Sequence, residues 1–154
     1  MKKLFILLSL SFSLISVTYA DVKTNIMKFK ALNACEKCDL SGADLRDKKT
    51  RETIYNNAQL SGANLSNANM RNTYLADTNL SGADLRLHDS EKLNFTKANL
   101  SKANLSGVDL SGANLSGADL SGANLTDTIL TNANLDEAIL CNTKMPWGVD
   151  DSGC

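Results

Sequence analysis

Few side chains in this sequence belong to the types that carry out chemistry by themselves: four cysteines and one histidine among 154 residues. The cysteines form two groups, Cys35 with Cys38 and Cys141 with Cys154. A Cys-x-x-Cys spacing occurs in zinc sites, in thioredoxin-like redox motifs and, with a following histidine, at c-type haem. No βαβ pattern surrounds the first pair, and Asp39 rather than a histidine follows it. The redox and haem interpretations are therefore disfavoured.

The single histidine stands in His88-Asp89-Ser90, which holds the residue types of a hydrolase triad. Three consecutive residues on an extended or turning backbone cannot adopt the geometry of nucleophile, base and orienting group. A metal site at His88 with Asp89 and Glu91 lacks a second soft or imidazole ligand nearby. We therefore predict no catalytic residue, no metal and no cofactor, and we expect that the protein is not an enzyme.

The first twenty residues indicate export. Met1-Lys2-Lys3 is a short positive start, an apolar run follows over 4–17, and Thr18-Tyr19-Ala20 places small side chains before a possible cleavage point. This layout predicts a secretory signal peptide over 1–20. The alternative is an uncleaved membrane anchor, but the apolar run is short for a spanning helix of about 20 residues. We expect a secreted or periplasmic bacterial protein that has no stable membrane insertion after processing. An even number of cysteines in such an oxidising space favours disulfides over free thiols.

The charge of the chain excludes a strongly basic nucleic-acid binder. Lys and Arg number 16 against 17 Asp and Glu, and removal of Lys2 and Lys3 leaves 14 against 17, a net charge of −3. The charge is uneven, because residues 21–102 carry 13 basic and 10 acidic groups whereas residues 103–154 carry one and seven. At 5% of the chain, aromatic residues are too few for a base-stacking platform. We predict no nucleic-acid partner.

A five-residue repeat positions everything between residues 38 and 145. An apolar residue, usually Leu, stands at every multiple of five from 40 to 145 except Thr50 and Ser90. Ala is common two residues before each centre, Asn or Asp one residue before it, and Gly two residues after it. This period fits neither a helix nor a long strand. Within a unit, small, polar and Leu residues alternate inward and outward as in a short strand, and Ser-Gly suits a corner. The pattern predicts a solenoid of stacked coils.

Units such as Ala113-Asn114-Leu115-Ser116-Gly117 resemble the pentapeptide repeat family. The resemblance covers residues 38–145 and implies an all-β fold, a right-handed quadrilateral β-helix with four units per coil and about five and a half coils. The Cys-x-x-Cys-Asp-Leu-Ser-Gly opening and the Cys-Asn-Thr-x-Met-Pro ending are similar to secreted bacterial members. Some members of the family are DNA mimics that bind a type II topoisomerase, an alternative that the export signal and the net charge of −3 disfavour here.

On this coil count the two cysteine pairs lie at opposite ends of a rod, roughly 25 Å apart at about 4.8 Å per coil. That distance excludes a four-cysteine zinc site. Only Cys35–Cys38 and Cys141–Cys154 disulfides can then form without bending the rod. We expect an N-terminal cap over 21–37, as a short helix or plug, and a C-terminal capping loop over 146–154 in which Trp147 sits on the last coil and hides its edge.

Irregular units mark the first candidate interaction surface. Lys48 and His88 replace the small inward residue on one face, two coils apart, so residues 46–51 and 87–92 are expected to bulge. Loops on rigid scaffolds often carry function. The candidate contact residues are Lys48, Lys49, Arg51 and His88. The alternative interpretation is tolerated defects with solvated charges.

The second candidate is a small apolar patch at Ile54 and Tyr74, which occupy outward positions on one face in adjacent coils. Single exposed apolar residues are ordinary, so this patch competes with a purely structural interpretation. We expect a non-enzymatic exported scaffold or protein-interaction module that is a monomer or weak dimer, with a protein partner that the sequence leaves unidentified. A secreted effector or surface binder is the alternative.

Overall fold

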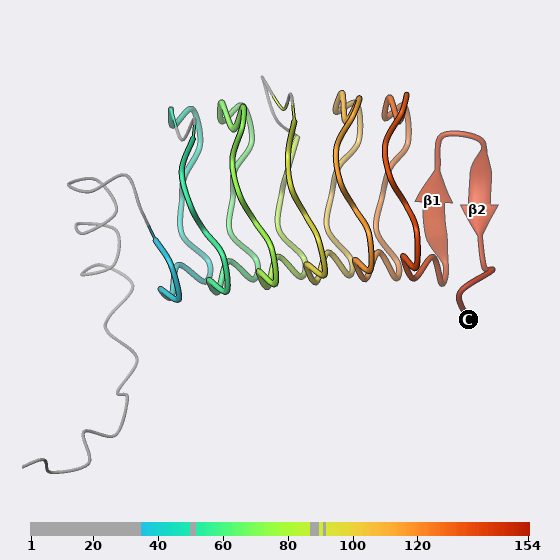
Figure 1. The fold of residues 1–154 in the computed structure, drawn as a ribbon, viewed down its shortest axis with the longest axis horizontal. Helices are drawn as coiled ribbons and strands as arrows, with labels where there is room; N and C mark the ends of the chain where they lie inside the picture. The colour runs from blue at the N-terminus through green and yellow to red at the C-terminus, as the bar shows by residue number, and fades with distance from the viewer. Residues whose placement is uncertain (1–34, 50–51, 87–89, 91) are drawn as a thin grey trace, which may run out of the picture.

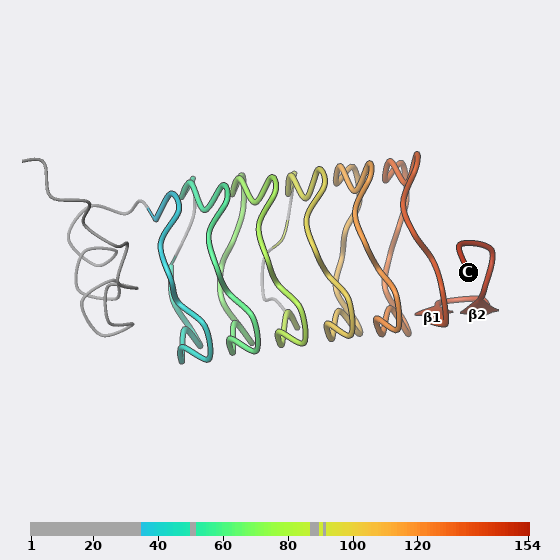
Figure 2. The same ribbon diagram turned by 90° about the horizontal axis from the view of Figure 1, so that it is seen from below.

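The structure, a computed structural model, describes residues 35–49, 52–86, 90 and 92–154. The predicted signal peptide over 1–20, residues 21–34 of the predicted N-terminal cap, Arg51 and His88 lie outside the described residues. The described chain winds into a rod of stacked coils that ends in a C-terminal hairpin (Figure 1). A view turned by 90° shows the same regular stacking of the coils (Figure 2). No helix in the described part of the chain is long and apolar enough to cross a bilayer.

The coils are joined by a ladder of single parallel bridges between residues twenty positions apart, as in Asn94↔Asn114 and Asn114↔Asn134. Twenty residues are four five-residue units, so a coil places one short strand segment on each of four sides. At each segment the backbone bonds in both directions. Leu115 N–H donates to Asn134 O at 2.8 Å, and Asn134 N–H donates to Ala113 O at 2.9 Å. The all-β solenoid predicted from the repeat is confirmed.

The axis of the rod is filled by the central residue of each unit. Leu60, Leu80 and Leu120 are 0% exposed, and Ala63 and Ala118, two residues before their centres, are also fully buried. The residue between the two inward positions faces out, which confirms the predicted alternation within each unit. Ala is the usual residue at this position because protein interiors are close-packed, but the expectation that only small side chains fit there is wrong, since Leu93 and Val108 occupy it and are each 1% exposed.

Threonine shares the small inward position with alanine, which the repeat pattern did not indicate. Thr78, Thr128 and Thr143 are buried. Each of their hydroxyl groups donates to a backbone carbonyl of the preceding coil at 2.8 Å. A buried hydroxyl is costly unless it is hydrogen-bonded, so these bonds explain how Thr replaces Ala at these three positions.

Each corner depends on two local features of its unit. The last corner residue has a positive φ, for example +64° at Gly62 and +61° at Asn57, a region that Gly and Asn tolerate best. The Asn or Asp before each centre accepts a hydrogen bond from the N–H two residues later, as Asp119 does from Ser121 at 2.9 Å. The Asn/Asp preference in the repeat is therefore turn chemistry, and it occupies the oxygens of most outward polar side chains.

The C-terminal hairpin consists of β1 (Thr143–Met145) and β2 (Gly148–Asp150), paired antiparallel with Met145 opposite Gly148. β1 still belongs to the ladder, because Lys144 bridges Asn124. The prediction that Trp147 covers the last coil is wrong, since its side chain is 68% exposed. The reason is the register: a two-residue connection between paired strands places Trp147 at the tip of the hairpin rather than across the axis.

We predict that Leu115→Asp unfolds the protein. Leu115 is 0% exposed, and an unpaired charge at the axis costs several kcal/mol, out of a total stability of about 5–15 kcal/mol. Asn114→Asp is the matched control, because it adds the same charge one residue away on the outer face, where Asp119 already performs the same turn function. Thermal denaturation followed by circular dichroism measures both. An unchanged melting temperature for Leu115→Asp would show that this side chain does not face the axis.

Candidate functional site

The first candidate surface keeps its basic side chains exposed but does not bulge where the structure describes it. Lys48 and Lys49 are exposed, whereas Ala68, which holds the position of Lys48 one coil later, is fully buried. Asn69 N–H nevertheless donates to Lys48 O at 2.9 Å, and Lys49 bridges Asn69 in the ladder. The expected bulge over 46–51 is therefore absent at these two residues. The ladder requires the Lys48 carbonyl, so only the side chain turns outward.

The second irregular segment, 87–92, is described only at Ser90 and Lys92. Ser90 is 5% exposed, and its hydroxyl donates to the backbone carbonyl of Asp109 in the next coil. Ser90 occupies a central position, and its hydroxyl is buried and hydrogen-bonded to the backbone, as the hydroxyl groups of Thr78, Thr128 and Thr143 are, although it donates to the following coil and they donate to the preceding one. His88, predicted as a contact residue, lies outside the described residues, and so does most of the segment 87–92 that was expected to bulge.

The apolar pair Ile54 and Tyr74 lies side by side on the outer face. The two residues form a parallel bridge, and their side chains are 43% and 50% exposed. The next residue of this ladder is Asn94, so the apolar surface ends after two coils. Lys49 lies one unit before Ile54 in the same coil, on the adjoining side of the rod. The structure therefore brings a basic position and an apolar pair to the same corner region.

Two ion pairs, which the sequence reasoning missed, neutralise a neighbouring side of the rod. Arg46 contacts Asp44 at 2.7 Å and Arg86 contacts Asp84 at 2.6 Å. The hydrogen bonds from Arg46 lower the pKa of Asp44 to about 2, and those from Arg86 lower the pKa of Asp84. Each arginine follows its aspartate by two residues, a spacing that could have indicated the pairs. Arg46 and Arg86 are neutralised by the neighbouring aspartates. Among the described residues, the exposed basic side chains near the N-terminal end of the rod that lack such a partner are therefore mainly lysines.

The cysteines are joined in the two pairs that the rod geometry allows. Cys35 and Cys38 form one disulfide with a Cα–Cα distance of 5.3 Å, and Cys141 and Cys154 form the other with 4.6 Å. No cysteine of the described chain is free. The described residues also contain no group of three or more His, Cys, Asp or Glu side chains placed to hold a metal ion.

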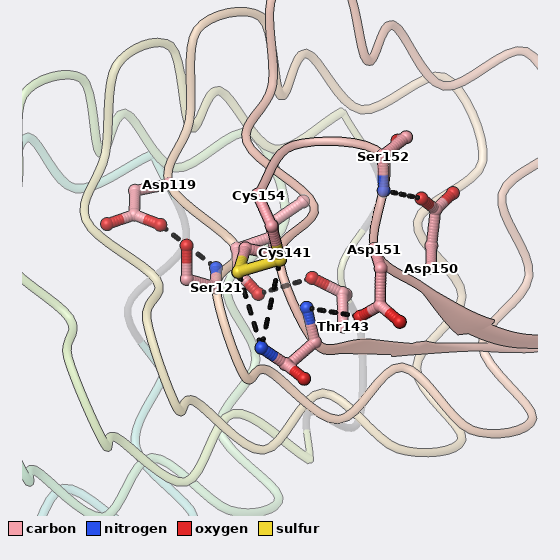
Figure 3. The surroundings of a disulfide bond; sticks show 10 residues. Asp119, Ser121, Cys141, Thr143, Asp150, Asp151, Ser152 and Cys154 are labelled. Carbon is pink, nitrogen blue, oxygen red and sulfur yellow. Dashed lines mark hydrogen bonds between the residues drawn. A yellow bond between two sulfur atoms is a disulfide. The ribbon is translucent and has the colours of Figure 1, made fainter.

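The second disulfide ties the C-terminal tail to the last coil (Figure 3). Asn142 N–H donates to Asp151 Oδ1 at 3.0 Å, and the Asn142 amide donates to Cys141 Sγ at 3.3 Å. Gly153 approaches the backbone so closely that a Cβ there would lie 2.6 Å from Leu140 N. The tail is therefore packed against one side of the last coil.

Comparison with known proteins identifies the repeat and places the fold. The family model for pentapeptide repeats matches in eight copies, over residues 56–87, 91–112 and 109–145. No curated protein sequence matches significantly.

Three solved structures show the likeness. Rfr23, a pentapeptide repeat protein from the cyanobacterium Cyanothece 51142, is 28% identical over 75% of this chain and 92% of its own, with a TM-score of 0.48. QnrB1, a plasmid-mediated fluoroquinolone resistance protein, is 21% identical over 66% of this chain and 60% of its own, with a TM-score of 0.50. HetL from Nostoc sp. strain PCC 7120, involved in heterocyst differentiation regulation, is 31% identical over 75% and 65%, with a TM-score of 0.38. The matched part thus spans less than two thirds of QnrB1 and of HetL.

We predict that peptide mapping without reduction recovers Cys35–Cys38 and Cys141–Cys154 linkages. Cys141→Ser should lower the melting temperature, because a disulfide that closes a loop of about 14 residues stabilises by roughly 3 kcal/mol. Cys35→Ser is the comparison, since its loop is far shorter and its loss should be smaller. A Cys38–Cys141 or Cys35–Cys154 linkage would contradict the separation of the pairs at opposite ends of the rod.

We predict that Arg86→Gln raises the pKa of Asp84 towards the ordinary aspartate value of about 3.9. The pair stabilises the fold above that pH, and the contribution is lost as the pH falls through the lowered pKa of Asp84. Titration of the carboxyl signals by NMR measures the shift. Arg46→Gln is the control, because it lies two coils away and should leave the pKa of Asp84 unchanged. Equal effects of the two variants would contradict the local origin of the shift.

Proposed function

Because the chain belongs to the pentapeptide-repeat family, whose model matches residues 56–87, 91–112 and 109–145, we propose that it is a non-enzymatic scaffold that acts by binding another protein. Proteins of this family fold as right-handed quadrilateral β-helices and are generally structural or interaction proteins. We propose that this chain forms about five and a half such coils over residues 38–145, because each coil contains four five-residue units.

The observation that carries the proposal is the filled axis. Apart from Ser90, which is 5% exposed, the described central residues from Leu40 to Leu125 are 0–1% exposed, and buried Ala or Thr residues occupy most of the small inward positions described. Enzymes and small-molecule carriers generally need a concave pocket lined by convergent polar groups. A rod whose interior is occupied by its own side chains offers its partners an outer surface and its two ends.

Most outward polar side chains already form hydrogen bonds within the corners of the coils, which leaves few regions of the outer surface as candidates for binding a partner. Asn and Asp side chains accept hydrogen bonds from the corner N–H groups, as Asn99 does from Ser101 at 3.0 Å. Four outward positions depart from this pattern with an exposed, large apolar side chain: Ile54, Tyr74, Ile129 and Ile139. Only the first two bridge each other, because Ile129 pairs with Asp109 and Ile139 with Asp119. Together with Lys48 and Lys49 on the adjoining side, Ile54 and Tyr74 form the side patch that we propose for the partner.

We further propose that the protein works outside the cytoplasm, in the periplasm or after secretion. The sequence over 1–20 has the layout of a signal peptide, and two disulfides are typical of oxidising compartments. The alternative, a secreted effector or surface binder, would also act by binding a protein, but its partner would belong to another organism. The DNA-mimic alternative is less favoured, because a net charge of −3 after processing is small for a molecule that imitates a polyanion.

A photo-crosslinking amino acid at position 74 tests this proposal in cells of the source organism. We predict a specific crosslinked partner from position 74 and none from position 114, which lies on the same side two coils further along. Fractionation of the same cells shows whether the processed protein, beginning at Asp21, is periplasmic, surface-held or secreted. Equal crosslinking from both positions would contradict a binding site at the side patch.

The matching loss-of-binding variant is Ile54→Ser with Tyr74→Ser. Exposed substitutions of this kind change stability by about 0.5 kcal/mol or less, so the melting temperature should stay near that of the wild type. Lys48→Ser, Lys49→Ser and Arg51→Ser together test the basic part in the same way. A partner that binds both variants as well as the wild type does not use the side patch.

A further inference from the structure

The C-terminal end of the rod is capped on only part of its perimeter. The hairpin and the tail cover the side of Thr143 and Met145, which are 0% and 3% exposed. On the sides that come earlier in the same coil, the inward residues are only partly buried. These residues are Leu130, Ala133, Leu135 and Ala138. The inward residues one coil earlier, such as Leu110 and Leu115, are 0% exposed. The difference marks an opening in the cap.

The opposite end of the described rod is more fully buried. Cys35, Leu40 and Leu45 are 4%, 0% and 1% exposed, and Cys38 is partly buried. A run of partly exposed central leucines therefore occurs, within the described residues, at the C-terminal coil. We call residues 127–138 the open edge.

Backbone groups on the open edge lack the ladder partners that their counterparts have. In the preceding coil Leu115 N–H donates to Asn134 O at 2.8 Å. Among the described residues, no acceptor is present for the N–H of Leu130 or Leu135, and no donor for the carbonyl of Ala133. An unpaired sheet edge of this kind is a template for another extended chain. The open edge thus combines free ladder positions with exposed apolar side chains.

The charged side chains around the open edge indicate the charge of the partner segment that it could bind. Asp127, Asp136 and Glu137 are exposed at its corners. Residues 126–154 carry five acidic side chains against one basic side chain, Lys144, a net charge of −4. A second copy that docked end to end would bring two such charges together, and like charges at an interface suppress association. A basic segment is complementary in charge.

We propose that the open edge binds a short basic segment of a partner protein that continues the ladder on two adjoining sides of the C-terminal coil and turns at the corner between them. Its carbonyl groups accept hydrogen bonds from Leu130 N–H and Leu135 N–H, and one of its N–H groups donates to the carbonyl of Ala133. Its apolar side chains cover the exposed axis and contact Ile129, which is 51% exposed. Its Lys or Arg side chains face Asp136 and Glu137. This inference rests on the proposed function as a protein-binding rod, and it assigns a second surface, separate from the side patch.

Three synthetic peptides test the proposal on the oxidised protein as isolated. The first alternates Lys and Val over ten residues, the second alternates Glu and Val, and the third is the Lys-Val peptide with N-methylated backbone amides. Fluorescence anisotropy should give the Lys-Val peptide at least about tenfold tighter binding than either of the others, with an affinity that falls as salt is added. Equal binding of the basic and acidic peptides would overturn the proposal.

Hydrogen exchange followed by NMR locates the binding. In the free protein the amides of Leu130 and Leu135 should exchange much faster than those of Leu110 and Leu115, which donate in the ladder. The Lys-Val peptide should slow exchange at the first two and leave the last two unchanged. Protection at the side patch instead, or no protection at Leu130 and Leu135, would show that the open edge is not the site.

Glu137→Lys is the variant that should weaken binding of the Lys-Val peptide, by about fivefold or more, because it reverses a charge at the open edge. Asp77→Lys is the matched control, since it reverses a charge at the same corner three coils away. Melting temperatures of both should match that of the wild type. If both variants weaken binding equally, the peptide responds to overall charge and the proposal fails.

Sedimentation velocity addresses the other possible occupant. A concentration-dependent dimer that protects the amides of Leu130 and Leu135 would assign the open edge to a second copy and overturn the basic-segment proposal. The crosslinking experiment at position 74 tests the proposed function independently of the peptide experiments. If a partner is crosslinked from position 74 but no peptide binds the open edge, the proposed function stands and the open-edge proposal fails. If neither is observed, both proposals fail.

Discussion

The twenty-residue register of the backbone ladder is the constraint on which the rest of this structure depends. Each side of an inner coil forms backbone hydrogen bonds with the coils before and after it, as Asn114 N–H does with Leu93 O and Leu115 N–H with Asn134 O. A coil cannot satisfy its backbone alone, so stability is shared between neighbours rather than held in one compact core. The register also explains why irregular side chains are tolerated. Lys48 leaves the axis, but its carbonyl keeps its place in the ladder.

The same register decides what the interior can contain. Four short sides leave room for one central side chain and one small residue from each unit, and Leu with Ala or hydrogen-bonded Thr meets this requirement. Several buried polar side chains donate a hydrogen bond to a backbone carbonyl of a neighbouring coil, as Ser90 and Thr78 do. Because side chains of the protein fill the interior, a partner can bind only on the outside of the rod. The candidate regions are outward positions at which the Asn/Asp pattern changes, and the two ends.

At each end of the described rod the ladder lacks a neighbouring coil to complete its backbone hydrogen bonds. At the C-terminus, antiparallel β2 supplies a partner for β1, and the Cys141–Cys154 disulfide holds the tail against Ile139 and Leu140. This cap serves one part of the perimeter and leaves the open edge without a next coil. The protein therefore presents two regions of different chemistry. The side patch is apolar with lysines beside it, and the open edge is apolar with carboxylates and free backbone groups.

The sequence by itself determined the repeat, the inward and outward positions, the stacking of Ile54 on Tyr74 and the separation of the cysteine pairs. These follow from a five-residue period that continues without insertion, because register alone sets them. Only the tertiary structure decided the Asp44–Arg46 and Asp84–Arg86 pairs, the intact ladder at Lys48, the exposure of Trp147 and the incomplete cap over Leu130 and Leu135. Each of these depends on where a side chain or a non-repeating tail turns once the ladder is formed. A periodic pattern specifies the coils, but it carries no information about the place where the period ends.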